Sequence, residues 1–219
     1  MADPNRQYWN RQFKHLQDTW PKADDFENCI RICLELHAMV HSKGSEQDCS
    51  ISFEDEVWQL FNEDKFRRYH PGDQSIVWKL WHSARIEDMT MNVLIADREQ
   101  VFDEGSWHDK LKIKARDTGN AMDEAEITDL SRTADIDAVR EYRKAVAERT
   151  RIVISSLHPL DLKRKVESTR LEQLLKDGSV VQSASGLLDY WGKKTCSGLL
   201  LMPATRHYLV HINESLRLL

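Results

Sequence analysis

The sequence predicts an all-α fold, an antiparallel four-helix bundle with an extra helix at its N-terminus. Glycine and proline number only 8 and 5 among 219 residues, too few for the frequent turns of an all-β protein. Apolar residues recur at helical spacing over four long segments that are joined by connectors of mixed length. Hydrophobic residues make up 41% of the chain, enough for a core, so we expect a single domain over residues 1–219.

The N-terminal segments predict two helices. Pro4 to Trp20 is amphipathic and forms the extra helix of an extension over residues 1–22. The core of the bundle is expected over residues 24–218. Its first helix runs from Asp24 to Ser42, because apolar residues recur there every three or four positions, and Lys43-Gly44 ends it.

The next segments predict a short helix, a turn and the second long helix. Phe53 to Phe61 follows Ser52, a residue type that caps helix N-termini. His70 to Asp73 contains Pro-Gly and reads as a turn. Ser75 to Phe102 is strongly periodic, with one apolar face expected to point inward. The polar stretch from Gly105 to Asp129 is expected to be a connector, long enough for a functional loop or lid.

The C-terminal third predicts the remaining helices. Ile136 to Leu157 is periodic and precedes Pro159, which ends it. A short helix is expected from Leu171 to Lys176. The last segment, Leu187 to Leu219, is helical with a break or restart near Pro203, because proline lacks the N–H group that the helix needs.

Charge and cysteine content exclude several classes of function. The net charge is −5 with a pI near 6.0, and basic residues are interspersed with acidic ones, so we expect no nucleic-acid partner. The sequence contains no run of 18 or more apolar residues, so we expect no membrane span. The N-terminus has no apolar secretory signal, and the four cysteines show no disulfide pattern, which predicts a cytoplasmic protein.

Two histidines in the last helix are the strongest chemical signal. His207 and His211 lie four residues apart, so their side chains share one face. That face also holds Ala204, Ser215 and Leu218, and an unpaired buried polar group costs about 1–3 kcal/mol. A divalent metal ion would satisfy both imidazoles. The alternative is two half-exposed histidines that are hydrogen-bonded to carboxylates or to the backbone.

A third histidine strengthens the metal interpretation. His82 lies in line with Ile86, Met89 and Val93 on the inward face of the predicted second helix. Three imidazoles leave coordination positions open, which is typical of catalytic rather than structural sites. Taken alone, His82 would be a hydrogen-bonded core histidine.

Two motifs resemble signatures of the DinB-like superfamily. Residues 75–88, SIVWKLWHSARIED, resemble the signature of its second helix, and residues 203–214, PATRHYLVHINE, resemble that of its fourth. Trp107 and Asp117-Thr118-Gly119 in the connector, together with residues 142–146, resemble one subgroup. The likeness covers about residues 24 to 216.

The resemblance implies a four-helix bundle of DinB-like type with a metal held by one histidine of the second helix and two of the fourth. Carried over by position, the ligands are His82, His207 and His211. Members use zinc, nickel, iron or manganese, and zinc or nickel is the metal that we expect here ahead of the other two. Many members are homodimers. Those with known activity include bacillithiol transferases and mycothiol-dependent maleylpyruvate isomerase, which implies a small-molecule substrate and a low-molecular-weight thiol.

A second face that contains histidines is another candidate for a metal site. Cys29, Cys33, His37 and His41 follow one another at intervals of four residues. Each such step turns the side chain by about 40°, so the two ends diverge by about 120°. One ion could take an adjacent pair but not all four residues, and we expect a semi-buried face of small, soft side chains.

Other polar residues near the predicted ligands have open roles. Arg85, Glu87, Asp88, Asn213 and Glu214 flank the predicted ligands, and a carboxylate or amide beside a ligand would orient its imidazole. Asn213 and Glu214 also suit a helix surface or a dimer face. Arg85 and Arg206 could hold an anionic substrate group, although a structural role is favoured for each. Cys196 is expected to be a buried, inert thiol.

Two classes of function remain open. The first is a metal-dependent enzyme that activates a thiol for transfer or isomerisation, or a water for hydrolysis, with no catalytic side chain assigned. The second is a non-catalytic, metal-stabilised interaction module of the stress-related kind. An enzyme should have an open pocket at the metal, whereas a module should have a filled site and no cavity for a substrate.

Overall fold

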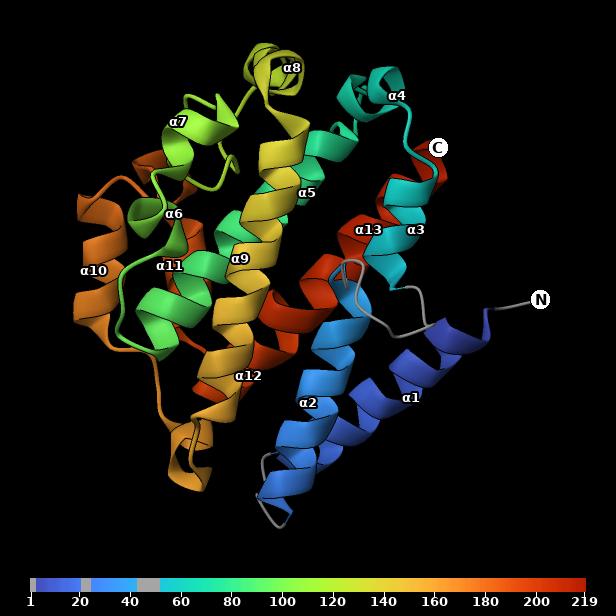
Figure 1. Ribbon diagram of the computed structural model, residues 1–219. Coiled ribbons are helices and arrows are strands. Elements are labelled where there is room, and N and C mark those ends of the chain that lie inside the picture. Colours follow the sequence, from blue (N-terminus) through green and yellow to red (C-terminus); the bar gives the residue numbers. More distant parts are fainter. Residues whose placement is uncertain (1–2, 21–24, 43–51) are drawn as a thin grey trace.

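The computed structural model describes residues 3–20, 25–42 and 52–219, and these ranges are helical without a β-strand (Figure 1). The all-α prediction is confirmed. The longer helices are α1 Pro4–Thr19, α2 Phe26–Val40, α5 Ile76–Asp88, α9 Ile136–Ser155 and α13 His207–Leu218. The shorter ones are α3 Phe53–Gln59, α4 Glu63–Arg67, α6 Val101–Glu104, α7 Trp107–Leu111, α8 Glu124–Thr133, α10 Ser168–Lys176, α11 Gly186–Gly192 and α12 Cys196–Leu201.

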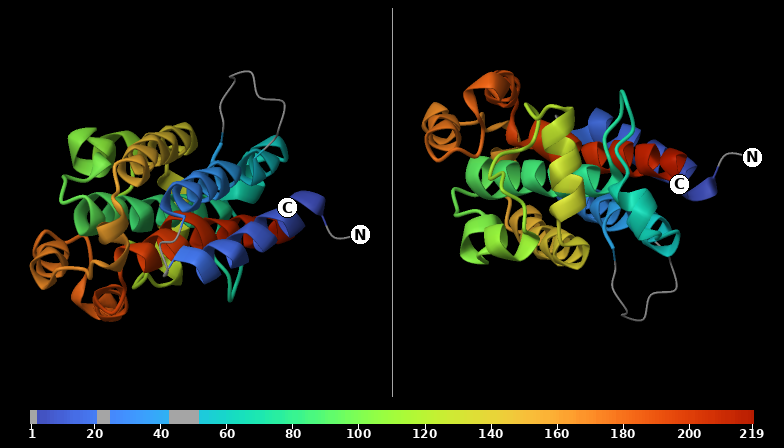
Figure 2. Two further views of the ribbon diagram at one scale, coloured as in Figure 1. Left: turned by 90° about the horizontal axis from the view of Figure 1, so that it is seen from below. Right: turned by 90° about the horizontal axis from the view of Figure 1, so that it is seen from above.

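Four helices contact one another in a closed ring around the core. α5 packs against α9 and α13, and α2 packs against the same two helices. α1 lies on the outer side of α2, and α10 and α11 lie on the opposite side of the molecule (Figures 1 and 2). These contacts are those expected of the predicted bundle. The alternating direction of its four helices stays a prediction.

Helix α5 is buried along its whole length. It begins after Ser75, whose hydroxyl accepts a hydrogen bond from the Trp78 amide at 3.1 Å. Each of its 13 residues is buried, whereas the sequence indicated one inward face. A helix that is covered on every side must find partners for its polar residues as well, which here are Lys79, His82, Ser83, Arg85, Glu87 and Asp88.

The helix predicted from Ser75 to Phe102 ends earlier. After α5 the chain continues as a π-helical segment, Met89–Ile95, and Asp97 then has a φ of 55°, outside the right-handed helical region. Phe102 belongs to the separate helix α6. The carboxylate of Asp88 accepts hydrogen bonds from the backbone amides of Val101 and Phe102, each at 2.9 Å. The chain therefore folds back onto the end of α5.

The predicted connector from Gly105 to Asp129 is partly helical, which corrects that expectation. It contains α7 and the first half of α8. Asp123 and Glu126 form a reciprocal capping box at the start of α8, with both hydrogen bonds at 2.9 Å. Asp followed three residues later by Glu is a helix-start signal, and the polar composition of the stretch obscured it. The non-helical part in between, residues 112–123, crosses α5 and is called the crossing loop below.

The expected break near Pro203 is a π-helical turn. Residues Met202–Arg206 connect α12 directly to α13. Proline has no N–H group to donate, and the Thr205 hydroxyl lies 3.1 and 2.9 Å from the carbonyl oxygens of Leu200 and Leu201. A π-turn closes hydrogen bonds five residues apart rather than four. It therefore rotates His207 and the residues after it relative to an uninterrupted α-helix.

Several local predictions are confirmed. Ser52 caps α3 in a capping box, and residues 70–73 form a turn in which Gly72 has a φ of 78°. α1 and α9 begin at the expected residues. The predicted stop of the second helix at Lys43-Gly44 lies outside the described residues.

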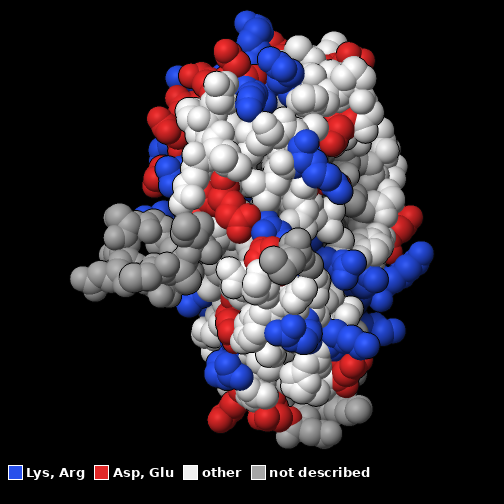
Figure 3. Space-filling view, turned by 90° about the vertical axis from the view of Figure 1, so that its right-hand side faces the viewer, with Lys and Arg blue, Asp and Glu red and all other residues white. Residues whose placement is uncertain are grey.

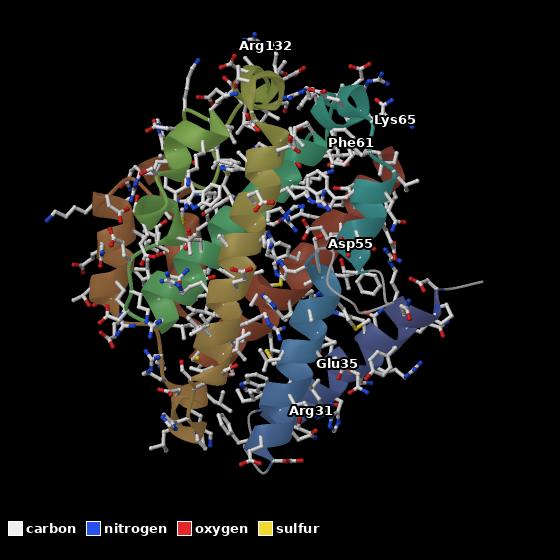
Figure 4. The ribbon with its side chains drawn as sticks, in the orientation of Figure 1. Arg31, Glu35, Asp55, Phe61, Lys65 and Arg132 are labelled. Atoms are coloured by element: carbon white, nitrogen blue, oxygen red, sulfur yellow. The ribbon has the colours of Figure 1, made fainter. Side chains whose placement is uncertain are left out.

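The surface carries both signs of charge. On the face shown in Figure 3, lysine and arginine side chains are interspersed with aspartate and glutamate. Arg31, Lys65 and Arg132, labelled in Figure 4, are exposed on α2, α4 and α8. None of the helices in the described ranges is long and apolar enough to cross a membrane.

We expect Asp88→Ala to lower the free energy of unfolding by about 3–5 kcal/mol, because it leaves the buried Arg85 guanidinium without its charge partner. Asp88 lies 3.4 Å from Arg85 Nη1 and accepts a hydrogen bond from the Tyr142 hydroxyl at 2.6 Å. Urea denaturation would measure the change. The matched control is Glu141→Ala at an exposed position of α9, expected to change stability by less than about 0.5 kcal/mol. Equal effects of the two variants would contradict the account.

Candidate metal centre

Helices α5 and α13 bring the three predicted histidines together. Each of His82, His207 and His211 offers one ring nitrogen that could bind a metal ion, and these three nitrogens lie within 4.8 Å of one another. The Nε2 atoms of His207 and His211 are 3.1 Å apart, and the ring centroid of His82 is 5.1 and 5.3 Å from the other two centroids. The convergence of two segments 125 positions apart in sequence is thus a property of the fold.

Hydrogen bonds orient two of the three imidazoles. His82 Nδ1 donates to the carbonyl oxygen of Thr118 at 2.6 Å, and His211 Nδ1 donates to the carboxylate of Glu214 at 2.8 Å. Because each of these oxygens only accepts, the proton is on Nδ1, and Nε2 presents a lone pair to the space shared by the three rings. Metal-binding histidines are commonly oriented in this way by a carboxylate or a carbonyl.

Burial keeps His82 and His207 neutral. His82 is 3% exposed, and burial together with the nearby His211 lowers its pKa to about 3. Burial and the imidazoles of His82 and His211 also lower the pKa of His207 well below its ordinary value. Neutral imidazole is the form that binds a metal ion. The hydrogen bond from His211 lowers the pKa of Glu214, so this carboxylate is ionised at neutral pH.

The crossing loop holds His82 from the side. The indole of Trp78 stacks on His82 with centroids 4.4 Å apart. Gly119 has a φ of 74°, and a Cβ at this position would lie 2.7 Å from Trp81 and 2.9 Å from Trp78. Only glycine therefore allows the loop to approach α5 closely enough for the Thr118 carbonyl to reach His82.

A pocket of about 200 Å³ opens onto the histidines. His82 and His207 form its polar end. The other lining residues are Ile86, Asn120, Leu187, Tyr190, Trp191, Met202 and Pro203. A larger hollow of about 700 Å³, between residues 113–133 and 181–183, is lined by none of the three histidines. The small pocket is the one that gives access to the candidate site.

The residues expected near the ligands have different roles. Glu214 orients His211, as one of the predicted possibilities. Asn213 instead accepts a hydrogen bond from Arg6 at 2.9 Å, and Arg85 bonds to Tyr142, Gln100 and the carbonyl of Arg116. Arg206 lies over the ring of Phe13. The structural interpretation of Arg85 and Arg206 thus agrees with their contacts, and Glu87 turns away to histidines of α2.

The described cysteines are free and buried. Cys29, Cys33 and Cys196 form no disulfide, and Cys49 lies outside the described residues. Burial raises the pKa of Cys196 to about 12. A thiol with this pKa stays protonated and unreactive at neutral pH, as predicted.

Comparison with known families identifies the fold. Residues 55–180 match the family model of the DinB superfamily, over half of the chain. The chain belongs to the DinB superfamily. The matched part includes His82 and ends before His207 and His211, which the structure places beside it. A search of curated proteins gave no match.

The donor set fits the metal ion that the superfamily binds. Three imidazoles converge, and two have one ring nitrogen engaged by an acceptor. In the third imidazole, that of His207, the Nδ1 atom is buried without a hydrogen-bond partner among the described residues. Such a set could hold zinc or another divalent transition metal, with positions left open toward the pocket.

These pKa values predict that the metal-free protein loses stability as the pH falls. His82 and His207 take up protons near pH 6.5 when unfolded but only at much lower pH when folded. Between pH 6.5 and about 4 the unfolded state binds more protons, so the free energy of unfolding falls by up to about 1.4 kcal/mol per pH unit for each histidine. Urea denaturation at several pH values would measure this slope. His82→Gln lacks one such group and should show a smaller slope, and an equal slope would refute the assignment.

Proposed function

We propose that the protein is a metal-dependent enzyme that acts on a small molecule at an ion held by His82, His207 and His211. The supporting observation is the mainly apolar pocket that His82 and His207 line. A purely structural site would be closed by a fourth protein ligand. Here the space beside His82 and His207 is lined mainly by carbon atoms.

The protein groups have separable roles in this proposal. The three imidazoles bind the ion, and the Thr118 carbonyl and the Glu214 carboxylate hold two of them in the binding orientation. Leu187 and Trp191 exclude water from the pocket, and Asn120 supplies a polar group at its wall. A bound divalent ion would act as a Lewis acid and lower the pKa of a thiol or water that reaches it.

The pocket composition favours a nucleophile that comes from outside the chain. Its lining includes no serine, cysteine or lysine, and Cys196 is protonated. Transfer or isomerisation with a low-molecular-weight thiol and hydrolysis by water both meet this requirement, and thiol chemistry comes first by analogy within the superfamily. At about 200 Å³ the pocket is smaller than the roughly 300–1,000 Å³ of most ligand sites. It therefore accommodates the reactive part of a small substrate.

The alternative class is a non-catalytic metal-binding module. The open pocket is the observation against it. A single domain, cytoplasmic location and homodimer formation belong to the proposal as expectations from the sequence and from the superfamily.

We expect the metal to be required for turnover. His82→Ala should lose the ion of this site, measured by elemental analysis, and lose activity in a screen of low-molecular-weight thiols with electrophiles and of hydrolysable esters and amides. Leu187→Trp fills the pocket, so it should retain the ion and lose activity. Leu160→Trp, at a residue that is 90% exposed, is the matched control. Loss of the ion with an unchanged screen would favour the module instead.

We also expect Gly119→Ala to weaken metal binding by about 10–100-fold, because the displaced loop no longer orients His82. The matched control is Gly72→Ala. Gly72 has a φ of 78° and nothing within 4 Å of an added Cβ, so it has the same backbone cost of about 1–2 kcal/mol without the clash. Zinc titration against a chelator would compare the affinities at the site that His211→Ala removes. Equal affinities of the two glycine variants would contradict the role of the loop.

A further inference from the structure

A second cluster of metal-binding side chains lies between α2 and α5. His37 lies in the last turn of α2, His41 directly follows the end of this helix, and both face Glu87 of α5. Donor atoms of the three residues lie within 4.8 Å of one another, the same limit that holds for the three histidines described above. The side chains of His37 and Glu87 are 0% exposed, and that of His41 is 6% exposed.

Only one of the two contacts between histidine and carboxylate in this cluster is a hydrogen bond. His37 Nε2 lies 2.9 Å from Glu87 Oε1 in hydrogen-bond geometry. His41 Nε2 lies 3.2 Å from Glu87 Oε2, yet both atoms lack a hydrogen-bond partner among the described residues. The two atoms are thus close together without an N–H group directed from one to the other. Buried polar atoms in native proteins are almost always paired, and exceptions often mark an ion or a water.

A fourth polar group borders the cluster. The ring of Tyr208 lies 4.3 Å from the ring of His41, centroid to centroid. Its buried hydroxyl has no hydrogen bond of good geometry in the described ranges, although it lies close enough to Glu87 to interact with this carboxylate. Burial and the nearby Glu87 carboxylate raise the pKa of this phenol well above its ordinary value, so the hydroxyl is neutral. It is an oxygen donor beside the two unpaired atoms.

Within the described ranges, no lysine or arginine forms an ion pair with Glu87. Arg143, the buried arginine near Tyr208, donates to Glu54 at 2.7 Å and to the carbonyl of Leu80. The direct partners of Glu87 are the two imidazoles. An ionised carboxylate in a closed interior requires a compensating positive charge.

We propose that His37, His41 and Glu87, with the Tyr208 hydroxyl as the fourth ligand that closes it, form a second, structural site for a divalent cation such as zinc. Two imidazoles and one carboxylate are a donor set that zinc uses. The ion satisfies His41 Nε2 and Glu87 Oε2 at once and balances the carboxylate charge. The site is closed to substrates, so its effect is to cross-link α2 to α5.

The second site is separate from the three-histidine centre and does not depend on the proposed function. His82 and Glu87 are five residues apart on α5, which places their side chains about 140° apart around the helix axis. Helix geometry excludes a single ion bound by Cys29, Cys33, His37 and His41 together. The structure instead pairs the last two of these with a carboxylate from another helix.

The test counts metal ions per chain after loading with zinc and removing the excess. Wild type should bind two ions, Glu87→Gln and His211→Ala one each, and the double variant none. The exposed histidine variant His158→Asn, as matched control, should still bind two. In His211→Ala, removing the remaining ion with a chelator should lower the melting temperature, because only the structural ion is left.

One ion per chain in both wild type and Glu87→Gln would overturn the proposal. Anomalous diffraction from zinc-loaded wild-type crystals decides the case even if Glu87→Gln fails to fold. A peak between α2 and α5 supports the second site, and density for a water there without anomalous signal overturns it. A peak at this position but none beside His82 would refute the proposed function and leave the second site standing.

Discussion

The structure depends on burying a helix that has a polar side. Every residue of α5 is covered, including Arg85, Glu87 and Asp88. An unsatisfied polar group in such a place costs about 1–3 kcal/mol, and an unpaired charge costs more. Each of these side chains therefore requires a particular partner from another segment, and these requirements select one arrangement of the surrounding chain.

The partners come from well-separated parts of the sequence. The last turn of α2 and the residue after it supply two histidines to Glu87. α9 supplies the Tyr142 hydroxyl to Asp88, and the crossing loop supplies the Thr118 carbonyl to His82. Asp73, before α5, pairs with Lys79. Packing and polar pairing thus act at the same positions. His82 of the candidate metal centre lies on this buried helix, and residues held by packing and hydrogen bonds keep ligands in a binding geometry.

Two irregularities of the backbone position the residues of the candidate metal centre. The π-helical turn before His207 sets the direction of α13, and the left-handed residue Gly119 lets the loop contact α5. Both are departures from ideal helix geometry that cost free energy, and such departures cluster at functional sites. The pocket then forms where α11 and the π-turn meet these histidines.

The local predictions succeeded where the information is local. The cap at Ser52 and the break near Pro203 were predicted, because a cap or a missing N–H group acts within one turn of helix. The end of the helix after Asp88 was placed too late, because the carboxylate that folds the chain back bonds to amides 13 and 14 residues away. Glu87 was placed beside the three histidines, yet its partners lie on another helix.

By itself the sequence determined the helical class, the shared face of His207 and His211, and the candidacy of His82. These follow from spacing along one chain segment, since 3.6 residues per turn fixes which side chains are neighbours. Only the tertiary structure decided that the three rings converge, that a backbone carbonyl at Thr118 orients one of them, and that Glu87 meets His37 and His41. A carbonyl is present at every residue, and long-range partners are chosen by packing, so neither leaves a mark in the local pattern of side chains.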